Sequence, residues 1–135
     1  MQGTTLYRLR TDILRNFSSS ASEIDSAVEV IGSKEPSDGI KYKAGRLYWG
    51  ALTESSVYSA AVSATSFPWS SLNETAVQLS RSIELMEWVD TFAVDLSKDG
   101  RLWFVSNRLD KFSTFTMDFS GGQGANMRVL YMDTN

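Results

Sequence analysis

The chain has no histidine and no cysteine, so few of its side chains could do chemistry. Nucleophile and base pairs, zinc sites and thiolate chemistry draw mainly on those two residue types, and we expect no metal and no cofactor. Two of the remaining carboxylates, Asp90 and Asp95, could act as acid and base. Residues five apart on a strand point to opposite faces, so this pair is not expected to share a site. The sequence therefore favours a protein without catalytic residues.

Other classes of ligand have equally weak signals. The 13 lysine and arginine residues are scattered and the net charge is −3, which does not predict nucleic-acid binding. No apolar stretch approaches the roughly 18 residues of a membrane span, and the residues after Met1 are polar, unlike a signal peptide. The run Gly121-Gly122-Gln123-Gly124 could cradle a phosphate only before a helix, but a strand-like run follows it. We predict a long hairpin loop there.

A five-residue pattern occurs twice, 55 residues apart, and indicates the elements that surround these side chains. Gly45-Arg46-Leu47-Tyr48-Trp49 and Gly100-Arg101-Leu102-Trp103-Phe104 each consist of glycine, arginine, leucine and two aromatic residues. Repetition at this distance indicates one supersecondary unit that is built twice. Each glycine follows a strand-like run, and the Asp-Gly pair before the second copy is typical of a tight hairpin turn.

Alternating runs around each copy predict a four-stranded antiparallel sheet per unit. In the first unit the flanking strands are predicted at 37–43, 55–62 and 75–80, and in the second unit at 90–96, 113–119 and 126–131. Runs over 4–9 and 27–31 are predicted to end a preceding unit. The chain is thus predicted to be a single propeller fragment, 1–135, with the end of one blade at 1–32, a second blade at 37–81 and a third at 89–132.

Two structural alternatives exist at this point. A β-sandwich also has short strands at regular spacing, but it would not require two copies of one aromatic motif. Between 73 and 89, Leu79, Ile83 and Met86 fall at helical spacing, so a helix beginning near Asn73 competes with two strands. The aromatic side chains are predicted to pack between blades rather than to form a binding platform. They are Tyr48, Trp49, Trp69, Trp88, Trp103 and Phe104.

The second unit resembles a known family. Its segment LWFVSNRL over 102–109, followed by Asn-Met-Arg-Val-Leu over 126–130, is similar to a segment of the yellow and major royal jelly proteins. Leu14-Arg15-Asn16 and Asn73-Glu74-Thr75-Ala76-Val77 resemble further motifs of that family, so the resemblance covers nearly the whole chain. It implies an all-β fold that is part of a six-bladed β-propeller with four-stranded antiparallel blades. It also favours strand, turn and strand over 73–89.

A six-bladed propeller needs more than twice these 135 residues. An open set of blades leaves apolar faces and strand edges unpaired. We therefore expect the rest of a propeller, or a partner chain, to complete the fold, and we expect the isolated chain not to be a stable monomer.

The resemblance implies a secreted, non-catalytic protein that binds a biogenic amine or a lipid, or that assembles with partner chains. Conversion of dopachrome in the melanin pathway is the alternative. Residues at the ends of the innermost strands would line the central channel, and the candidates are Ser37, Asp38, Asp90, Thr91, Asn107 and Arg108.

We predict Asn107, Thr91, Asp90 and Arg108 as the ligand-binding residues. Asn107 offers both a donor and an acceptor, and Asp90 could counter a cationic ligand. The alternative is that Asn107 and Arg108 only satisfy backbone groups at the end of a blade.

This sequence also departs from the family pattern. Leu109 stands near the place of an aromatic residue, Ser59 near that of a cysteine, and Val89-Asp90-Thr91 replaces Pro-Ser-Gly. Two sequons in predicted loops, Asn16-Phe17-Ser18 and Asn73-Glu74-Thr75, make Asn16 and Asn73 predicted glycosylation sites.

Overall fold

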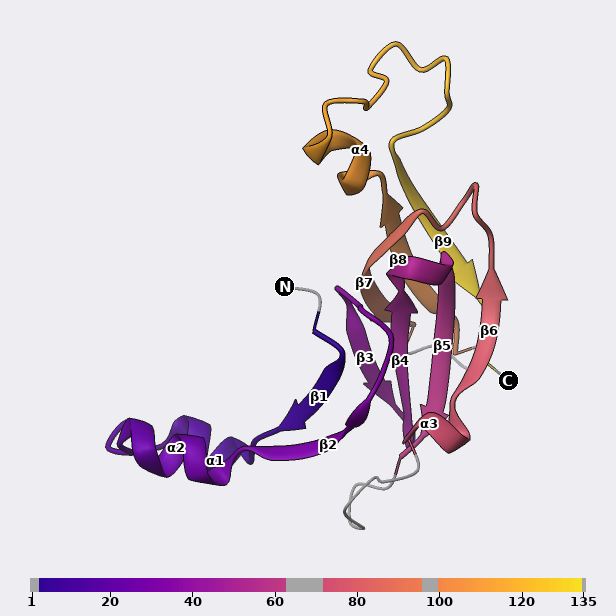
Figure 1. Cartoon of the computed structure of the whole chain (residues 1–135). Coiled ribbons are helices and arrows are strands. Elements are labelled where there is room, and N and C mark those ends of the chain that lie inside the picture. Colours follow the sequence, from indigo (N-terminus) through magenta and orange to yellow (C-terminus); the bar gives the residue numbers. More distant parts are fainter. Residues whose placement is uncertain (1–2, 63–71, 96–99, 135) are drawn as a thin grey trace.

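A computed structural model of the chain describes residues 3–62, 72–95 and 100–134, and it is built mainly from antiparallel β-sheets (Figure 1). Three sheets follow one another along the chain. The first pairs β1 (Thr5–Arg8) with β2 (Glu29–Ser33). The second has the order β3 (Ile40–Lys43), β4 (Arg46–Ala51), β5 (Ser56–Ala61) and β6 (Val77–Arg81). The third has the order β7 (Trp88–Val94), β8 (Leu102–Asn107) and β9 (Met127–Met132). This arrangement agrees with the predicted all-β class.

Short helices connect the strands. They are α1 (Thr11–Arg15), α2 (Ala21–Ala27), a 3-10 turn over Leu52–Glu54, α3 (Leu72–Thr75) and α4 (Leu109–Ser113). Figure 1 shows α1 and α2 projecting away from the sheets, between β1 and β2. A capping box begins α2, because the Ser20 hydroxyl accepts from the Glu23 amide and the Glu23 carboxylate accepts from the Ser20 amide.

Both copies of the repeated motif form the second strand of their sheet. Gly45 and Gly100 lie in the turns before β4 and β8 with φ of 80° and 56°, a conformation that glycine adopts without a steric penalty. The predicted turn at Gly45 is therefore confirmed, whereas Lys98 and Asp99 of the second predicted turn lie outside the described residues. Between 73 and 89 the prediction of strand, turn and strand is also confirmed, by β6 and β7. The competing helical pattern has no common buried face, since Ile83 is 70% exposed while Met86 is buried.

The predicted strand over 113–119 is wrong, and the third sheet has three strands in the described residues rather than four. The helix α4 ends at Ser113 instead, and Phe115 has a left-handed φ of 57°. The hydroxyls of Ser113 and Thr114 donate to the Asp110 carbonyl at 2.8 and 2.9 Å. Such side-chain bonds to the local backbone compete with the ladder of a strand. The glycine-rich run lies in the long connection from β8, through α4, to its neighbour β9.

Two apolar clusters hold the three sheets together. One lies between the first and second sheets and contains Leu47, Trp49, Ala60, Val62 and Leu72, with Leu6 of β1 packed against it. The other lies between the second and third sheets and contains Tyr48, Val57, Met86, Val89, Phe92, Leu102 and Phe104. Tyr48, Trp49 and Phe104 thus pack between sheets as predicted, Trp88 and Trp103 are only half-buried, and Trp69 lies outside the described residues.

The second and third sheets approach each other most closely at two glycines. A Cβ atom at Gly50 would lie 2.6 Å from the Cβ of Val89, and one at Gly39 would lie 1.9 Å from the carbonyl oxygen of Asp90. Both distances are shorter than van der Waals contact, so β7 can pass over β3 and β4 only where a side chain is missing. The Trp88 indole, which donates to the Asp38 carboxylate at 3.1 Å, joins the same two sheets.

Candidate functional site

An irregularity in β7 brings two of the predicted ligand-binding residues together. The register between β7 and β8 shifts between Val89 and Thr91, which makes Asp90 an extra residue in its strand. The Asp90 carboxylate accepts a hydrogen bond from Nδ2 of Asn107 at 3.1 Å. Thr91 is exposed and pairs with Val105, which shares a strand face with Asn107. Asp90, Thr91 and Asn107 therefore lie at one end of the third sheet.

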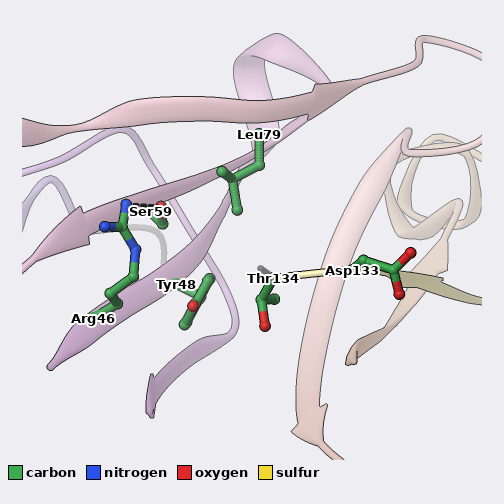
Figure 2. A pocket seen from close by; sticks show the side chains of 6 residues that line it. All are labelled: Arg46, Tyr48, Ser59, Leu79, Asp133 and Thr134. Atoms are coloured by element: carbon green, nitrogen blue, oxygen red, sulfur yellow. Dashed lines mark hydrogen bonds between the residues drawn. The ribbon is translucent and has the colours of Figure 1, made fainter. Parts of the chain in front are cut away.

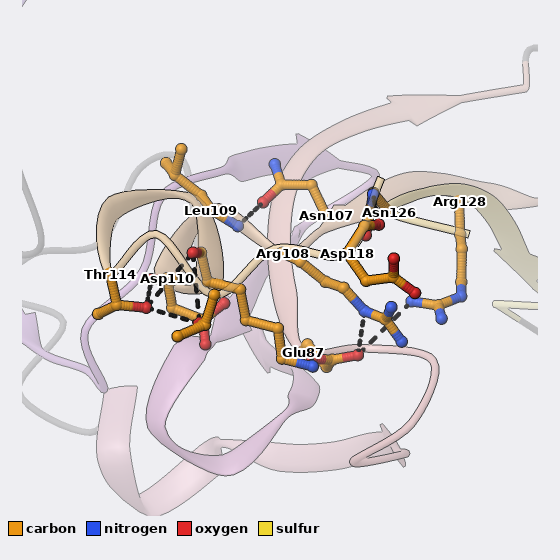
Figure 3. Close-up of polar contacts among 11 residues, drawn as sticks. Glu87, Asn107, Arg108, Leu109, Asp110, Thr114, Asp118, Asn126 and Arg128 are labelled. Atoms are coloured by element: carbon orange, nitrogen blue, oxygen red, sulfur yellow. Dashed lines mark hydrogen bonds and ion pairs between the residues drawn. The ribbon is translucent and has the colours of Figure 1, made fainter. Parts of the chain in front are cut away.

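The Asn107 side chain also supports α4. Its Oδ1 accepts from the amide of Leu109 at 3.0 Å, at the first residue of the helix (Figure 3). The side-chain amide of Asn107 thus links the irregularity in β7 to the start of α4.

Arg108 lies in a different cluster from the other three residues. Its Nε donates to Oε1 of Glu87 at 2.6 Å (Figure 3). Nζ of Lys111 contacts Oε2 of Glu87 at the same distance. A third cation, Arg128, has its Nη1 atom 3.8 Å from Oε1 of the same carboxylate. The Arg108 side chain is only 5% exposed. We call Glu87, Arg108, Lys111 and Arg128 the Glu87 cluster.

The ionisation of Glu87 reflects these neighbours. Burial raises the pKa of its carboxyl, but hydrogen bonds from Lys111 and Arg108 outweigh burial and lower that pKa below its ordinary value. The Glu87 carboxylate therefore stays charged and ties α4 and β9 to the start of β7.

A pocket of about 230 Å³ lies beside Asn107, between α4 and the start of β9. Its walls are mostly apolar: Leu109, Phe112, Met117 and Met127, with the amides of Asn107 and Asn126. Nδ2 of Asn126 donates to the Asp118 carbonyl at 2.7 Å. Its Oδ1 is buried and has no hydrogen-bond partner among the described residues. The pocket is thus bordered by a residue with an unpaired buried acceptor, and such an acceptor costs free energy unless a donor reaches it.

A second, more polar pocket of about 280 Å³ lies between the second and third sheets (Figure 2). Arg46, Tyr48 and Ser59 line it on one side, and Asp133 and Thr134 on the other. The Arg46 guanidinium donates to the Ser59 hydroxyl at 2.7 Å, so the residue near the family's cysteine position makes a polar contact here.

The family model of the major royal jelly proteins matches residues 1–134. The chain belongs to the major royal jelly protein family. No curated protein matches the chain at a significant level. For this member of the family, the resemblance drawn from residues 102–109 and 126–130 is confirmed.

Other predicted positions of this royal jelly family chain have structural partners. Ser37 is buried and accepts from Nζ of Lys34 at 2.6 Å, while Asp38 accepts from Trp88. The predicted glycosylation site Asn16 is exposed after α1. Asn73 belongs to α3 rather than to a loop, and its side chain lies outside the described residues.

Sequence reasoning missed three residues of this region. Phe112 supplies an aromatic ring to the pocket, although Leu109 stands near the expected aromatic position. Asn126 supplies the free acceptor, and Glu87 holds Arg108. The motif Asn126-Met127-Arg128 had a signal through the family resemblance, but Phe112 and Glu87 had none.

In the part of the chain that the structure describes, no three acidic, histidine or cysteine side chains lie together as metal ligands would. Within the same residues, no helix is long and apolar enough to cross a membrane.

Proposed function

We propose that the chain is a non-catalytic binding protein whose pocket between α4 and β9 takes a small amine with an apolar body. The observation that carries this proposal is the buried Oδ1 of Asn126, which has no partner among the described residues and belongs to a residue that lines a mostly apolar pocket. An ammonium or amine N–H of the ligand would satisfy that oxygen. Phe112 would attract a cation through its ring, and Asp90, fixed by Asn107, adds negative charge nearby.

The size of the pocket favours an amine over a lipid. A volume of about 230 Å³ is below the range of roughly 300 to 1,000 Å³ that drug-sized ligands occupy. A biogenic amine is closer to this size than a sterol is. Family membership supports the setting of this site in a secreted, six-bladed propeller, with the described sheets as successive blades and with glycans on Asn16 and Asn73.

The alternative function, dopachrome conversion, requires a positioned base for proton transfer. The described residues that line the pocket include no titratable side chain. Binding without turnover is therefore our preferred function.

Titration calorimetry of the chain with serotonin, dopamine and a sterol tests this proposal, beside an absorbance assay of dopachrome. We expect heat of binding from an amine and none from the sterol. Phe112→Ala should weaken amine binding about fivefold to tenfold, which corresponds to about 1 kcal/mol. Phe119→Ala, at a ring that is 78% exposed and is not part of the pocket, is the matched control. Dopachrome turnover that Asp90→Asn abolishes would instead establish the enzyme.

A further inference from the structure

Three buried polar atoms on one face of the third sheet have no hydrogen-bond partner among the described residues. They are Oγ of Ser106, Nη1 of Arg108 and Nη1 of Arg128. Ser106 in β8 pairs with Arg128 in β9, so their side chains lie on the same face of the sheet. Arg108 follows β8, and Figure 3 shows its guanidinium next to that of Arg128. Buried donors are nearly always paired, so this gathering requires a partner, either water or a ligand.

The charges around these donors do not balance. In the Glu87 cluster one carboxylate lies among three cations. The Lys111 side chain is 30% exposed, so water solvates its charge, and Arg108 donates to Glu87 through Nε. Nη1 of Arg128 lies 3.8 Å from the same carboxylate, which is too far for a hydrogen bond. Among the described residues, one largely buried positive charge thus has no hydrogen-bonded counter-charge, and such a charge is costly.

Two other carboxylates of this region are engaged elsewhere. Oδ1 of Asp118 accepts from the Ser120 amide at 2.7 Å, and Oδ2 accepts from the Gln123 amide at 2.8 Å. Asp110 is exposed in the first turn of α4. Within the residues that the structure describes, neither carboxylate forms an ion pair with the two arginines. No described side chain therefore supplies the missing negative charge.

An exposed loop borders the site. The glycine-rich run reaches Arg128, because a Cβ atom at Gly124 would lie 3.7 Å from its Nη2. Every residue from Phe119 to Ala125 is exposed. The Nη1 donors themselves are buried, yet the Arg128 side chain keeps 13% of its surface in contact with solvent. This narrow opening favours a small ion over a bulky one.

We propose that Ser106, Arg108 and Arg128 bind one small monovalent anion, of the size of chloride. Both Nη1 atoms and the Ser106 hydroxyl donate to it, and hydrogen bonds between charged groups are the strongest that side chains make. Its single negative charge balances the guanidinium that Glu87 leaves uncompensated. The site uses none of the residues that line the amine pocket, so it stands independently of the proposed function.

Thermal unfolding in sodium chloride and in sodium gluconate, at equal ionic strength, tests the proposal. Gluconate is too bulky for the buried donors, and equal ionic strength holds screening constant. We expect the melting temperature of the native chain to rise with the logarithm of chloride concentration once the site fills. Arg128→Gln should lose this dependence. Arg15→Gln, at an exposed residue of α1, removes the same charge and should keep it.

A milder variant keeps the test decisive if Arg128→Gln does not fold. Ser106→Ala removes a hydroxyl that has no partner among the described residues, and it leaves every charge in place. It should fold like the native chain and bind chloride at least several-fold more weakly. The excess linewidth of the chloride NMR signal measures this binding directly. Ser113→Ala, at an exposed hydroxyl that donates to the Asp110 carbonyl, should broaden the signal as much as the native chain does.

Competition shows which anion fits the site. Excess bromide should remove the excess linewidth of the native chain, whereas gluconate at the same ionic strength should leave it. Displacement by sulfate but not by bromide would overturn the proposal in favour of a larger oxyanion. A native chain that melts at the same temperature in both salts, or equal linewidths in the native chain and in Ser106→Ala, would also overturn it, because water would then occupy the site.

Discussion

The second and third sheets carry the same sequence motif, yet one is covered on both faces and the other on one. In β4 every residue from Leu47 to Ala51 is buried, while exposed and half-buried residues alternate along β9. The motif specifies a strand with apolar side chains on both faces. Whether both faces become buried depends on the neighbouring sheets, because a pleated sheet cannot cover its own faces.

The two sheets also differ in the interactions that hold them to their neighbours. The Glu87 cluster joins β7, α4 and β9 through one carboxylate and three cations. The second sheet instead has apolar clusters on both sides. We therefore expect packing changes to dominate in the second sheet and charge changes to be felt in the third.

The largest effect should come from breaking the contact between the two sheets. Gly39→Ala places a Cβ atom 1.9 Å from the Asp90 carbonyl oxygen, and the two backbones must separate to relieve the clash. We expect the free energy of unfolding to fall by about 3 kcal/mol or more, measured by urea denaturation. Gly3→Ala, with no atom within 4 Å of the added carbon, should leave stability unchanged. Equal stability of the two variants would mean that β3 and β7 do not approach closely.

The next effect belongs to the third sheet. Glu87→Gln removes the charge that pairs with Arg108, whose side chain is 5% exposed, and leaves that cation buried without an opposite charge. Breaking a buried pair in this way should cost about 3 kcal/mol, at the low end of the usual range because Glu87 itself is 14% exposed. Glu84→Gln, at an exposed residue of the same turn, is the control for the loss of one acidic group. A loss of stability in Glu84→Gln but not in Glu87→Gln would contradict the stabilising role of the Glu87 cluster.

A matched pair of substitutions compares the face of the second sheet that carries Tyr48 with the face of the third sheet that carries Trp103. Val57 pairs with Gly50, and Val129 pairs with Val105, the equivalent of Gly50 in the repeat. Val57 is fully buried, whereas Val129 is 67% exposed. Val57→Ala should lower the free energy of unfolding by about 2 kcal/mol, through lost burial and the cavity that remains. Val129→Ala should change it by less than about 0.5 kcal/mol. Chemical denaturation at low concentration measures both, and similar losses would show that the third sheet is covered after all.

The smallest effect should be the contribution of Glu87 to the pH dependence of stability. The pKa of Glu87 is lower in the folded chain than in the unfolded one, so its stabilising contribution is present above the unfolded pKa and is lost as pH falls through the folded pKa. The melting temperature should therefore fall in acid, below the ordinary pKa of a glutamate. Glu87→Gln should show a smaller acid-induced fall than the native chain, although it melts lower at neutral pH. An identical acid response in both proteins would rule out a contribution from this carboxyl.

The strands around the repeated motif were predictable because their signals are local. Gly45 and Gly100 occupy left-handed turns, and the alternation on either side matches the observed registers. The helix α2 was missed although it has a local signal, the serine at position 20 followed three residues later by a glutamate. The run over 113–119 alternates like a strand, and only the bonds of its hydroxyls to the Asp110 carbonyl decide against one.

The site was less predictable, since its contacts join residues far apart in the chain. Asn107 and Asp90 are 17 residues apart and meet because β7 contains an irregularity that no sequence pattern announced. Arg108 and Glu87 are 21 residues apart and meet only through the fold. Because 113–119 was predicted as a strand, the preceding residues could not be placed as a helix that brings Phe112 over the end of the sheet.

Val105 occupies the position that Gly50 has in the first copy of the repeat, and this one difference limits what the chain can form. The face of the third sheet that carries Val89 and Phe92 fits over the second sheet only because Gly50 leaves room for Val89. The face that carries Val89 could not pack in the same way on another third sheet, because the side chain of Val105 fills that space. Stacking of identical third sheets is thereby disfavoured, which we expect to lower the tendency of this apolar face to aggregate.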